Sequence, residues 1–142
     1  SKTALQEISS DAFRETGLKK VAFPASLKKI GSQAFLGTHL EEVVFSAELQ
    51  EIGDEAFTGV AELTSVTLSN NIQRIGYRAF SDCEQLNKVA YVGEMKTADC
   101  MVEIGAFQNC TSLTSFTFPQ SLSEVPRMDF CRLQKVERNN PS

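Results

Sequence analysis

An Ala-Phe pair recurs along the whole chain at nearly constant spacing. It stands at Ala12-Phe13, Ala34-Phe35, Ala56-Phe57, Ala79-Phe80 and Ala106-Phe107, with Asp129-Phe130 as a degenerate sixth copy. Successive phenylalanines are 22, 22, 23, 27 and 23 residues apart. A period of about 20 to 50 residues that persists from end to end is typical of stacked-repeat proteins. The spacing therefore predicts a repeat solenoid rather than a globule.

Each copy follows one consensus, Leu-x-x-Val-x-(Phe/Leu)-x-x-x-(Leu/Ile)-x-x-Ile-Gly-x-x-Ala-Phe. Its Val-x-Phe segment alternates with period two and is rich in branched and aromatic residues, so it predicts a short strand, as at Val21-x-Phe23. One such strand per coil predicts a parallel sheet, because every coil returns the chain to the same side. We expect the Leu-x-x-Ile-Gly segment to form the opposite wall.

Three glycines end that opposite wall: Gly31, Gly53 and Gly76. We expect each of them where the backbone turn needs either a positive φ or room. Ser32 or Asp54 is then placed to cap one turn of helix around the Ala-Phe pair. The alanine would let adjacent coils approach each other, and the phenylalanine would fill the middle of the coil.

This pattern resembles the BspA-like leucine-rich repeats, also called the treponemal class, whose signature is Ile-Gly-x-x-Ala-Phe-x-x-Cys. Residues 75–83, Ile-Gly-Tyr-Arg-Ala-Phe-Ser-Asp-Cys, match the signature directly, and the resemblance covers nearly the whole chain. It implies an α/β repeat solenoid, a curved right-handed superhelix of five to six coils. Short parallel strands would form the concave wall, with short strands or single helical turns opposite. We expect one leucine-rich-repeat domain over residues 1–142, as a fragment of a longer repeat protein.

The copies depart from the signature in three places. Thr16, Thr38 and Val60 stand in the cysteine position of the first three copies, Ile104-Gly105-Ala106-Phe107 lacks the two spacer residues, and the last copy reads Val125-Pro126-Arg-Met-Asp129-Phe130. The fourth coil holds extra residues between Tyr91 and Ile104, which we expect to bulge from one edge. Such a loop is either a binding loop or drift without function.

Four cysteines, Cys83, Cys100, Cys110 and Cys131, stand at irregular spacings without a Cys-x-x-Cys pair, so a zinc site has little support. Cys83 and Cys110 occupy the same position of the repeat. Equivalent residues of stacked coils lie about 4.8 Å apart, within the Cα range of a disulfide, so a bridge stays open as an alternative. Buried free thiols are the favoured interpretation.

The sequence offers little chemistry for catalysis. His39 is its one histidine, in a predicted surface turn, whereas nucleophilic hydrolases need a base held against the nucleophile. The grouped carboxylates are Glu41-Glu42, Glu51 with Asp54-Glu55, and Glu7 with Asp11. They occupy variable positions, where solvated charge is expected, and familiar catalytic motifs are absent from the sequence. We therefore expect no enzyme, no cofactor and no metal ion.

Charge and hydropathy exclude two classes of partner. Lys and Arg number 14 against 18 Asp and Glu, without a basic cluster, which disfavours nucleic acid and anionic membranes. No apolar run approaches the roughly 18 residues that span a bilayer, and the first residues lack a signal peptide's apolar stretch. Asn109-Cys110-Thr111 fits the N-glycosylation rule, although a polar turn residue is the favoured interpretation.

The outward positions beside the predicted strands form two columns. Lys20, Glu42, Ser65, Lys88, Ser115 and Lys135 make up the first, and Ala22, Val44, Thr67, Ala90, Thr117 and Glu137 make up the second. The second column is small and largely uncharged, which permits close approach by a partner chain. β-propensity alone is an equally good explanation of its composition.

The resemblance implies attachment to proteins or host matrix by surface-exposed modules. We therefore expect a non-catalytic protein-binding module, on the cell surface or secreted, that binds a host extracellular matrix or plasma protein through the concave face. The alternatives are an intracellular scaffold in the cytoplasm and a structural spacer within a longer solenoid. Exposed terminal coils also predict end-to-end self-association.

Overall fold

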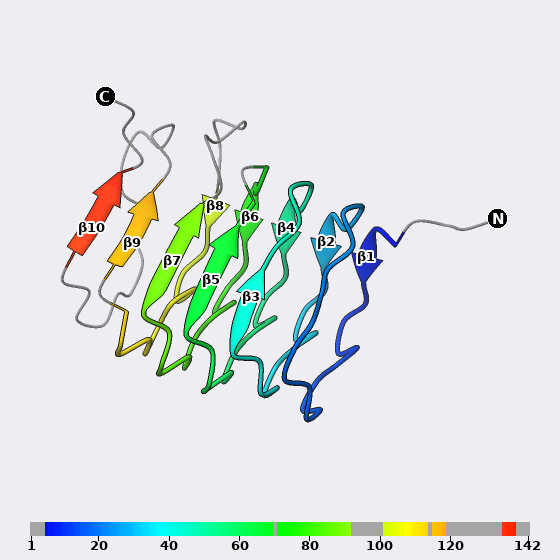
Figure 1. The fold of residues 1–142 in the computed structure, drawn as a ribbon, viewed down its shortest axis with the longest axis horizontal. Helices are drawn as coiled ribbons and strands as arrows, with labels where there is room; N and C mark the ends of the chain where they lie inside the picture. The colour runs from blue at the N-terminus through cyan, green and yellow to red at the C-terminus, as the bar shows by residue number, and fades with distance from the viewer. Residues whose placement is uncertain (1–4, 70, 92–100, 114, 119–134, 139–142) are drawn as a thin grey trace.

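Two parallel β-sheets form opposite walls of a solenoid (Figure 1). The computed structural model describes residues 5–69, 71–91, 101–113, 115–118 and 135–138. One wall, here called the short-strand sheet, contains in spatial order β1 (Glu7–Ile8), β2 (Lys29–Ile30), β4 (Glu51–Ile52), β6 (Arg74–Ile75) and β8 (Met101–Val102). The other, the long-strand sheet, contains β3 (Glu42–Val44), β5 (Ser65–Leu68), β7 (Lys88–Tyr91), β9 (Ser115–Phe118) and β10 (Lys135–Arg138). The predicted parallel sheet of one strand per coil is thus confirmed, on both walls.

The register places equivalent repeat positions side by side. In the short-strand sheet Ile8, Ile30, Ile52, Ile75 and Val102 are successive partners, and in the long-strand sheet Val43, Val66, Val89 and Phe116 are. Both walls are described for about four turns, so the expected five to six coils are not confirmed. The right-handed twist and the concavity of the long-strand sheet stay predictions.

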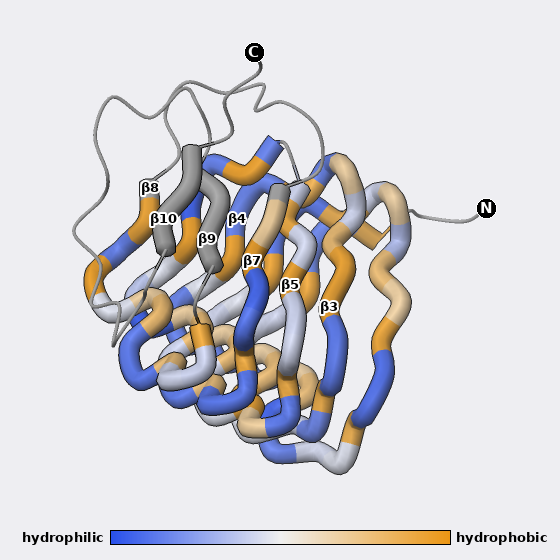
Figure 2. Tube along the Cα trace, turned by 60° about the vertical axis from the view of Figure 1, so that its left-hand side comes forward, coloured by the Kyte–Doolittle hydropathy of each residue, from blue (hydrophilic) through white to orange (hydrophobic). Residues whose placement is uncertain are grey.

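A stack of phenylalanine rings runs through the interior. Phe13, Phe35, Phe57, Phe80 and Phe107 have successive ring centroids 5.2, 5.1, 5.1 and 5.4 Å apart, with interplanar angles of 14°, 4°, 5° and 2°. All but Phe13 are fully buried. Such aromatic pairs contribute about 0.5–1.5 kcal/mol each beyond their area burial. Polar and apolar stretches alternate along the coloured part of the coils (Figure 2). The prediction that the phenylalanine fills the middle of the coil is confirmed.

The segment around each Ala-Phe pair is a run of tight turns, and the described residues contain no helix. We call it the turn wall (residues 31–38, 53–60, 76–83 and 103–110). In the second coil Gln33 and Gly37 have φ of 57° and 71°, and a left-handed residue cannot continue a right-handed helix. Alternate N–H groups therefore donate within the coil and to the next coil. Ala34 N–H donates to Gly31 O at 3.2 Å, but Phe35 N–H donates to Ala56 O of the next coil at 2.8 Å. The predicted helical turn is not confirmed, because these donors bond between coils.

Gly31, Gly53 and Gly76 are required for room, and none of the three has a positive φ. A Cβ on Gly53 would lie 2.7 Å from the carbonyl carbon of Gly31 in the preceding coil. Of the two predicted reasons for these glycines, a positive φ or room, the structure confirms room. Asp54 does not cap its own turn, because its Oδ1 accepts a hydrogen bond from Tyr77 N–H of the next coil at 2.9 Å.

The fifth copy keeps its full length, which corrects the expectation of two missing spacer residues. Because Ile75 pairs with Val102, the signature segment of that coil reads Val102-Glu103-Ile104-Gly105-Ala106-Phe107. Val102 takes the isoleucine position and Glu103 the glycine position. Ile104 becomes a spacer residue and is 62% exposed. In the sequence, Ile104-Gly105 looks like the Ile-Gly of the signature. The strand register shows instead that Val102-Glu103 takes that place.

The extra residues of the fourth coil fall between β7 and β8, as predicted. Nine positions separate the start of β5 from the start of β6, but thirteen separate the start of β7 from the start of β8. Residues 92–100, which include this insertion, lie outside the described residues. Its predicted bulge stays a prediction.

Candidate interaction face

The long-strand sheet presents the two predicted columns. Parallel pairing aligns Glu42, Ser65, Lys88, Ser115 and Lys135 in the first column, and Val44, Thr67 and Ala90 in the second, with Thr117 beside Glu137 farther along. Val43, Val66 and Val89 between the columns are buried, so the column residues of β3, β5 and β7, up to Ala90, point outward. The side chains of Ser115 and Thr117 lie outside the described part of the structure.

The first coil follows the sheet without forming a strand. Lys20 and Ala22 are exposed as predicted, but the strand predicted at Val21-x-Phe23 is wrong. Leu18 O accepts a hydrogen bond from His39 N–H at 3.0 Å, and the ring of Phe23 stacks on Phe45 at 5.3 Å. Pro24, which follows at once, has no N–H to donate and restricts the residue before it.

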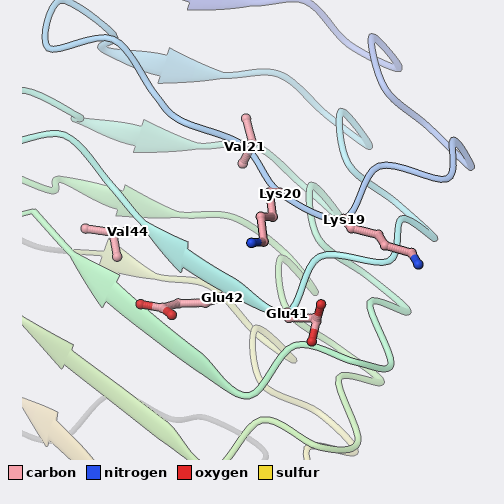
Figure 3. Close-up of a pocket in the computed structure, with 6 residues that line it drawn as sticks. All are labelled: Lys19, Lys20, Val21, Glu41, Glu42 and Val44. Atoms are coloured by element: carbon pink, nitrogen blue, oxygen red, sulfur yellow. The ribbon is translucent and has the colours of Figure 1, made fainter.

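A depression of about 510 Å³ lies where this first coil runs beside β3 (Figure 3). It is lined by Lys19, Lys20 and Val21 of the first coil and by Glu41, Glu42 and Val44 of the second. Val44, on β3, is 53% exposed and adds apolar surface to this depression. Three column residues of the predicted site, Lys20, Glu42 and Val44, therefore border a hollow that the sequence did not indicate.

His39 and Glu62 pair on the surface. His39 Nδ1 lies 3.1 Å and 3.2 Å from the two carboxylate oxygens of Glu62, and both side chains are about half exposed. The prediction of a surface histidine is confirmed.

Arg74 pairs with carboxylates from the coils on both sides of its own. Its guanidinium nitrogens lie 3.2 Å from Glu51, 2.6 Å from Asp54 and 3.2 Å from Glu103. Burial alone would lower the pKa of Arg74, but hydrogen bonds and attraction from Asp54, then Glu103, outweigh it and raise that pKa. These carboxylates therefore neutralise a cation, and Glu51 and Asp54 are not a free acid–base pair. The repeat alignment, which sets Arg74 opposite Glu51, carried this signal.

Cys83 and Cys110 are free, buried thiols, as predicted. Their sulfurs donate to Phe57 O at 3.2 Å and to Phe80 O at 3.1 Å, each in the coil before. Burial first, and then the neighbouring Cys110, raises the pKa of the Cys83 thiol well above its usual value. A protonated, enclosed thiol is a poor nucleophile, so these side chains serve packing.

Within the described residues, no group of three or more His, Cys, Asp or Glu is arranged to hold a metal ion. Nor does that part of the chain include a helix with the length and apolar character to cross a membrane.

Comparison with known families assigns the repeat. The model of the BspA type leucine rich repeat region matches in six copies, over residues 2–102 and 94–140. The chain belongs to this family. The resemblance inferred from the Ile-Gly-x-x-Ala-Phe-x-x-Cys signature is therefore confirmed. No curated protein matches this BspA-type chain.

Two solved structures are similar to this BspA-type chain. A leucine-rich repeat protein from Bacteroides ovatus is 28% identical, with a TM-score of 0.73 over 83% of this chain and 30% of the other. A leucine-rich repeat protein of T. pallidum, TpLRR, is 30% identical, with a TM-score of 0.63 over 77% of this chain and 50% of the other. The chain thus spans only part of the length of either protein. The repeat family indicates a protein-interaction module on a typically non-catalytic fold.

Proposed function

We propose that this BspA-type chain is a non-catalytic protein-binding module that contacts its partner with the outward face of the long-strand sheet. The face comprises Lys20, Ala22, Glu42, Val44, Ser65, Thr67, Lys88, Ala90, Ser115 and Thr117. One observation carries the proposal: the strand register lines up Val44, Thr67 and Ala90 as an exposed or partly exposed column of small side chains. Such a column lets another backbone come close over several coils.

The face is held rigid from beneath. Val43, Val66 and Val89 alternate with the column residues and are buried in the core, and parallel ladders join β3, β5 and β7. A preorganised surface loses little conformational entropy when it binds, so more of the contact energy contributes to affinity. A rigid surface with small side chains suits a folded or an extended protein partner.

The charges of the face favour a protein over a polyanion. Lys20, Glu42 and Lys88 stand in one column, with Ser65 between Glu42 and Lys88. Alternating signs create no strong positive field, which nucleic acid binding depends on. A partner with charges of both signs is the better match.

We place the protein on a cell surface or in secretion, bound to a host extracellular matrix or plasma protein, as one domain of a longer repeat protein. BspA-type repeat proteins are often surface-associated, which supports this placement. A second candidate is an intracellular scaffold that uses the same face. The free thiols of Cys83 and Cys110 favour it, because thiols persist in reducing compartments.

Saturable solid-phase binding to a panel of extracellular matrix and plasma proteins tests the proposal. The paired change Val44→Lys with Thr67→Lys adds bulk and charge to the face, and should weaken binding at least about tenfold. Ser32→Lys with Gln73→Lys is the matched control. It adds the same charge at exposed positions outside the face, one in the turn wall and one just before β6. Equal loss in both variants would show non-specific charge effects. No saturable binding to any panel member would contradict host attachment and leave the scaffold candidate.

A further inference from the structure

The edge of the long-strand sheet at β3 is not paired. In a parallel sheet, alternate residues direct their backbone groups to opposite neighbours. Phe45 N–H donates to Thr67 O of β5 at 3.0 Å, so Val43 and Phe45 face β5. Glu42 and Val44 therefore direct their amide and carbonyl groups toward the first coil. In the described structure no backbone hydrogen bond joins these two residues to residues 19–22.

The depression beside this edge is divided by charge. Lys19 and Lys20 line the side of the first coil, and Glu41 and Glu42 line the side of the second (Figure 3). All four side chains belong to exposed residues. Among the ion pairs of the described residues none joins either lysine to either glutamate. Unpaired opposite charges flank an unpaired strand edge, with the exposed Val44 beside both.

We propose that this depression is a binding site for an extended protein segment that carries one acidic and one basic side chain around a small apolar residue. The inference rests on the proposed function and names the chemistry of the partner. The acidic side chain pairs with Lys20, and the basic one pairs with Glu42. The small apolar side chain covers Val44, and the segment's backbone bonds with the free edge groups.

Charge complementarity selects this occupant over others. A polyanion such as nucleic acid or sulfated polysaccharide would meet Lys19 and Lys20 but be repelled by Glu41 and Glu42. A polycation meets the reverse pattern. Ion pairs at an exposed rim contribute little each, so the isolated segment binds weakly and adds selectivity to contacts along the face.

The test is a titration of the ¹⁵N-labelled chain, followed by NMR, with the capped peptide acetyl-Thr-Asp-Val-Lys-Thr-amide. Two peptides with single-sign charge, Asp-Val-Asp and Lys-Val-Lys in the same frame, are the controls. The mixed peptide should shift the amides of Glu42 and Val44 saturably. It should bind at least about fivefold more tightly than either control, and more weakly when salt rises from about 0.05 to 0.5 M. Equal or tighter binding of the Asp-Val-Asp peptide would replace the proposal with a simple lysine patch.

Charge-reversal variants locate the contacts. Lys20→Glu and Glu42→Lys change exposed side chains, so circular dichroism should show an intact fold, and each should weaken the mixed peptide several-fold. Lys29→Glu, at an exposed position of β2 in the short-strand sheet, is the matched control and should leave that binding unchanged. Shifts absent from Glu42 and Val44, or equal weakening by Lys29→Glu, would overturn the site.

The two proposals fail in different ways. If a panel protein binds, loss on Thr67→Lys with no change on Lys20→Glu would retain the face as a binding surface and reject the depression. If the mixed peptide binds but Thr67→Lys has no effect on binding of a panel protein, the depression is retained as a site and the wider face is rejected.

Discussion

At the turn wall, a methyl group added to Gly53 would lie 2.7 Å from the backbone of the preceding coil, whereas Thr67 on the long-strand face is partly exposed to solvent. The turn wall stacks backbone directly on backbone and fills the space behind it with phenylalanine. The long-strand face alternates buried valines with outward residues that touch little. The comparison teaches that close backbone packing constrains substitution on the turn wall, whereas the outward positions of the long-strand sheet should tolerate it.

Truncating a phenylalanine of the stack should lower the free energy of unfolding more than any other change to either side of the coil. Phe57 stacks between Phe35 and Phe80 at 5.1 Å on each side. Phe57→Ala should lower the free energy of unfolding by about 3–5 kcal/mol, measured by urea denaturation, because it leaves a cavity in the core. Phe13→Ala is the control and should cost clearly less, since Phe13 is 38% exposed. Equal losses would show that the stack is not what stabilises the wall.

Adding a methyl group where the backbones of two coils touch should cause the second largest loss of stability. Gly53→Ala should lower the free energy of unfolding by about 2–3 kcal/mol, because the backbone of the preceding coil must move away. Gly59→Ala separates this clash from conformational strain, since Gly59 has a φ of 73° but nothing within 4 Å of its added Cβ. That control should cost about 1 kcal/mol. A smaller loss at Gly53 than at Gly59 would reject close stacking as the constraint.

The buried thiol predicts a pH effect on the turn wall. Because the folded state raises the pKa of Cys83 above its value of 9.0 in the unfolded chain, the folded state holds more protons above that pH. Stability should therefore be constant below about pH 8 and fall by up to about 1.4 kcal/mol per unit above pH 9. Denaturation of wild type and Cys83→Val across this range measures the difference. Val60 fills the same position one coil earlier, and parallel pH curves would contradict the prediction.

Substitution on the long-strand face should have the smallest effect on stability. Thr67→Lys should change the free energy of unfolding by no more than about 0.5 kcal/mol, because its side chain points away from the core. Urea denaturation checks this value on the protein used for the binding test. A loss comparable to that of Gly53→Ala would mean that the face is also structural, and the contrast between the walls would fail.

Much of the fold could be predicted because the repeat averages out local ambiguity. The Ala-Phe period placed the stacked core, and the Val-x-Phe pattern placed the columns that include Glu42 and Val44, which the register confirms. The period did not reveal the turn wall's backbone, where Gln33 and Glu55 have positive φ. Neither residue type signals that conformation, so a helical turn was the natural expectation.

The candidate site was only half visible in the sequence. Outward positions follow from strand alternation, so Lys20 and Glu42 could be named. The depression between them could not, because it depends on the first coil remaining unpaired with β3. The Arg74 cluster escaped for a related reason: its partners Asp54 and Glu103 are 20 and 29 residues away and meet only through stacking.

The sequence by itself determined the family, the repeat unit and most of the buried side chains, because periodic apolar residues require periodic burial. The tertiary structure decided how the coils meet. It showed that Gly53 is needed for backbone contact, that Val102 rather than Ile104 aligns with Ile75, and that β3 retains a free edge. Those outcomes depend on distances between coils, and residue order along one coil does not contain them.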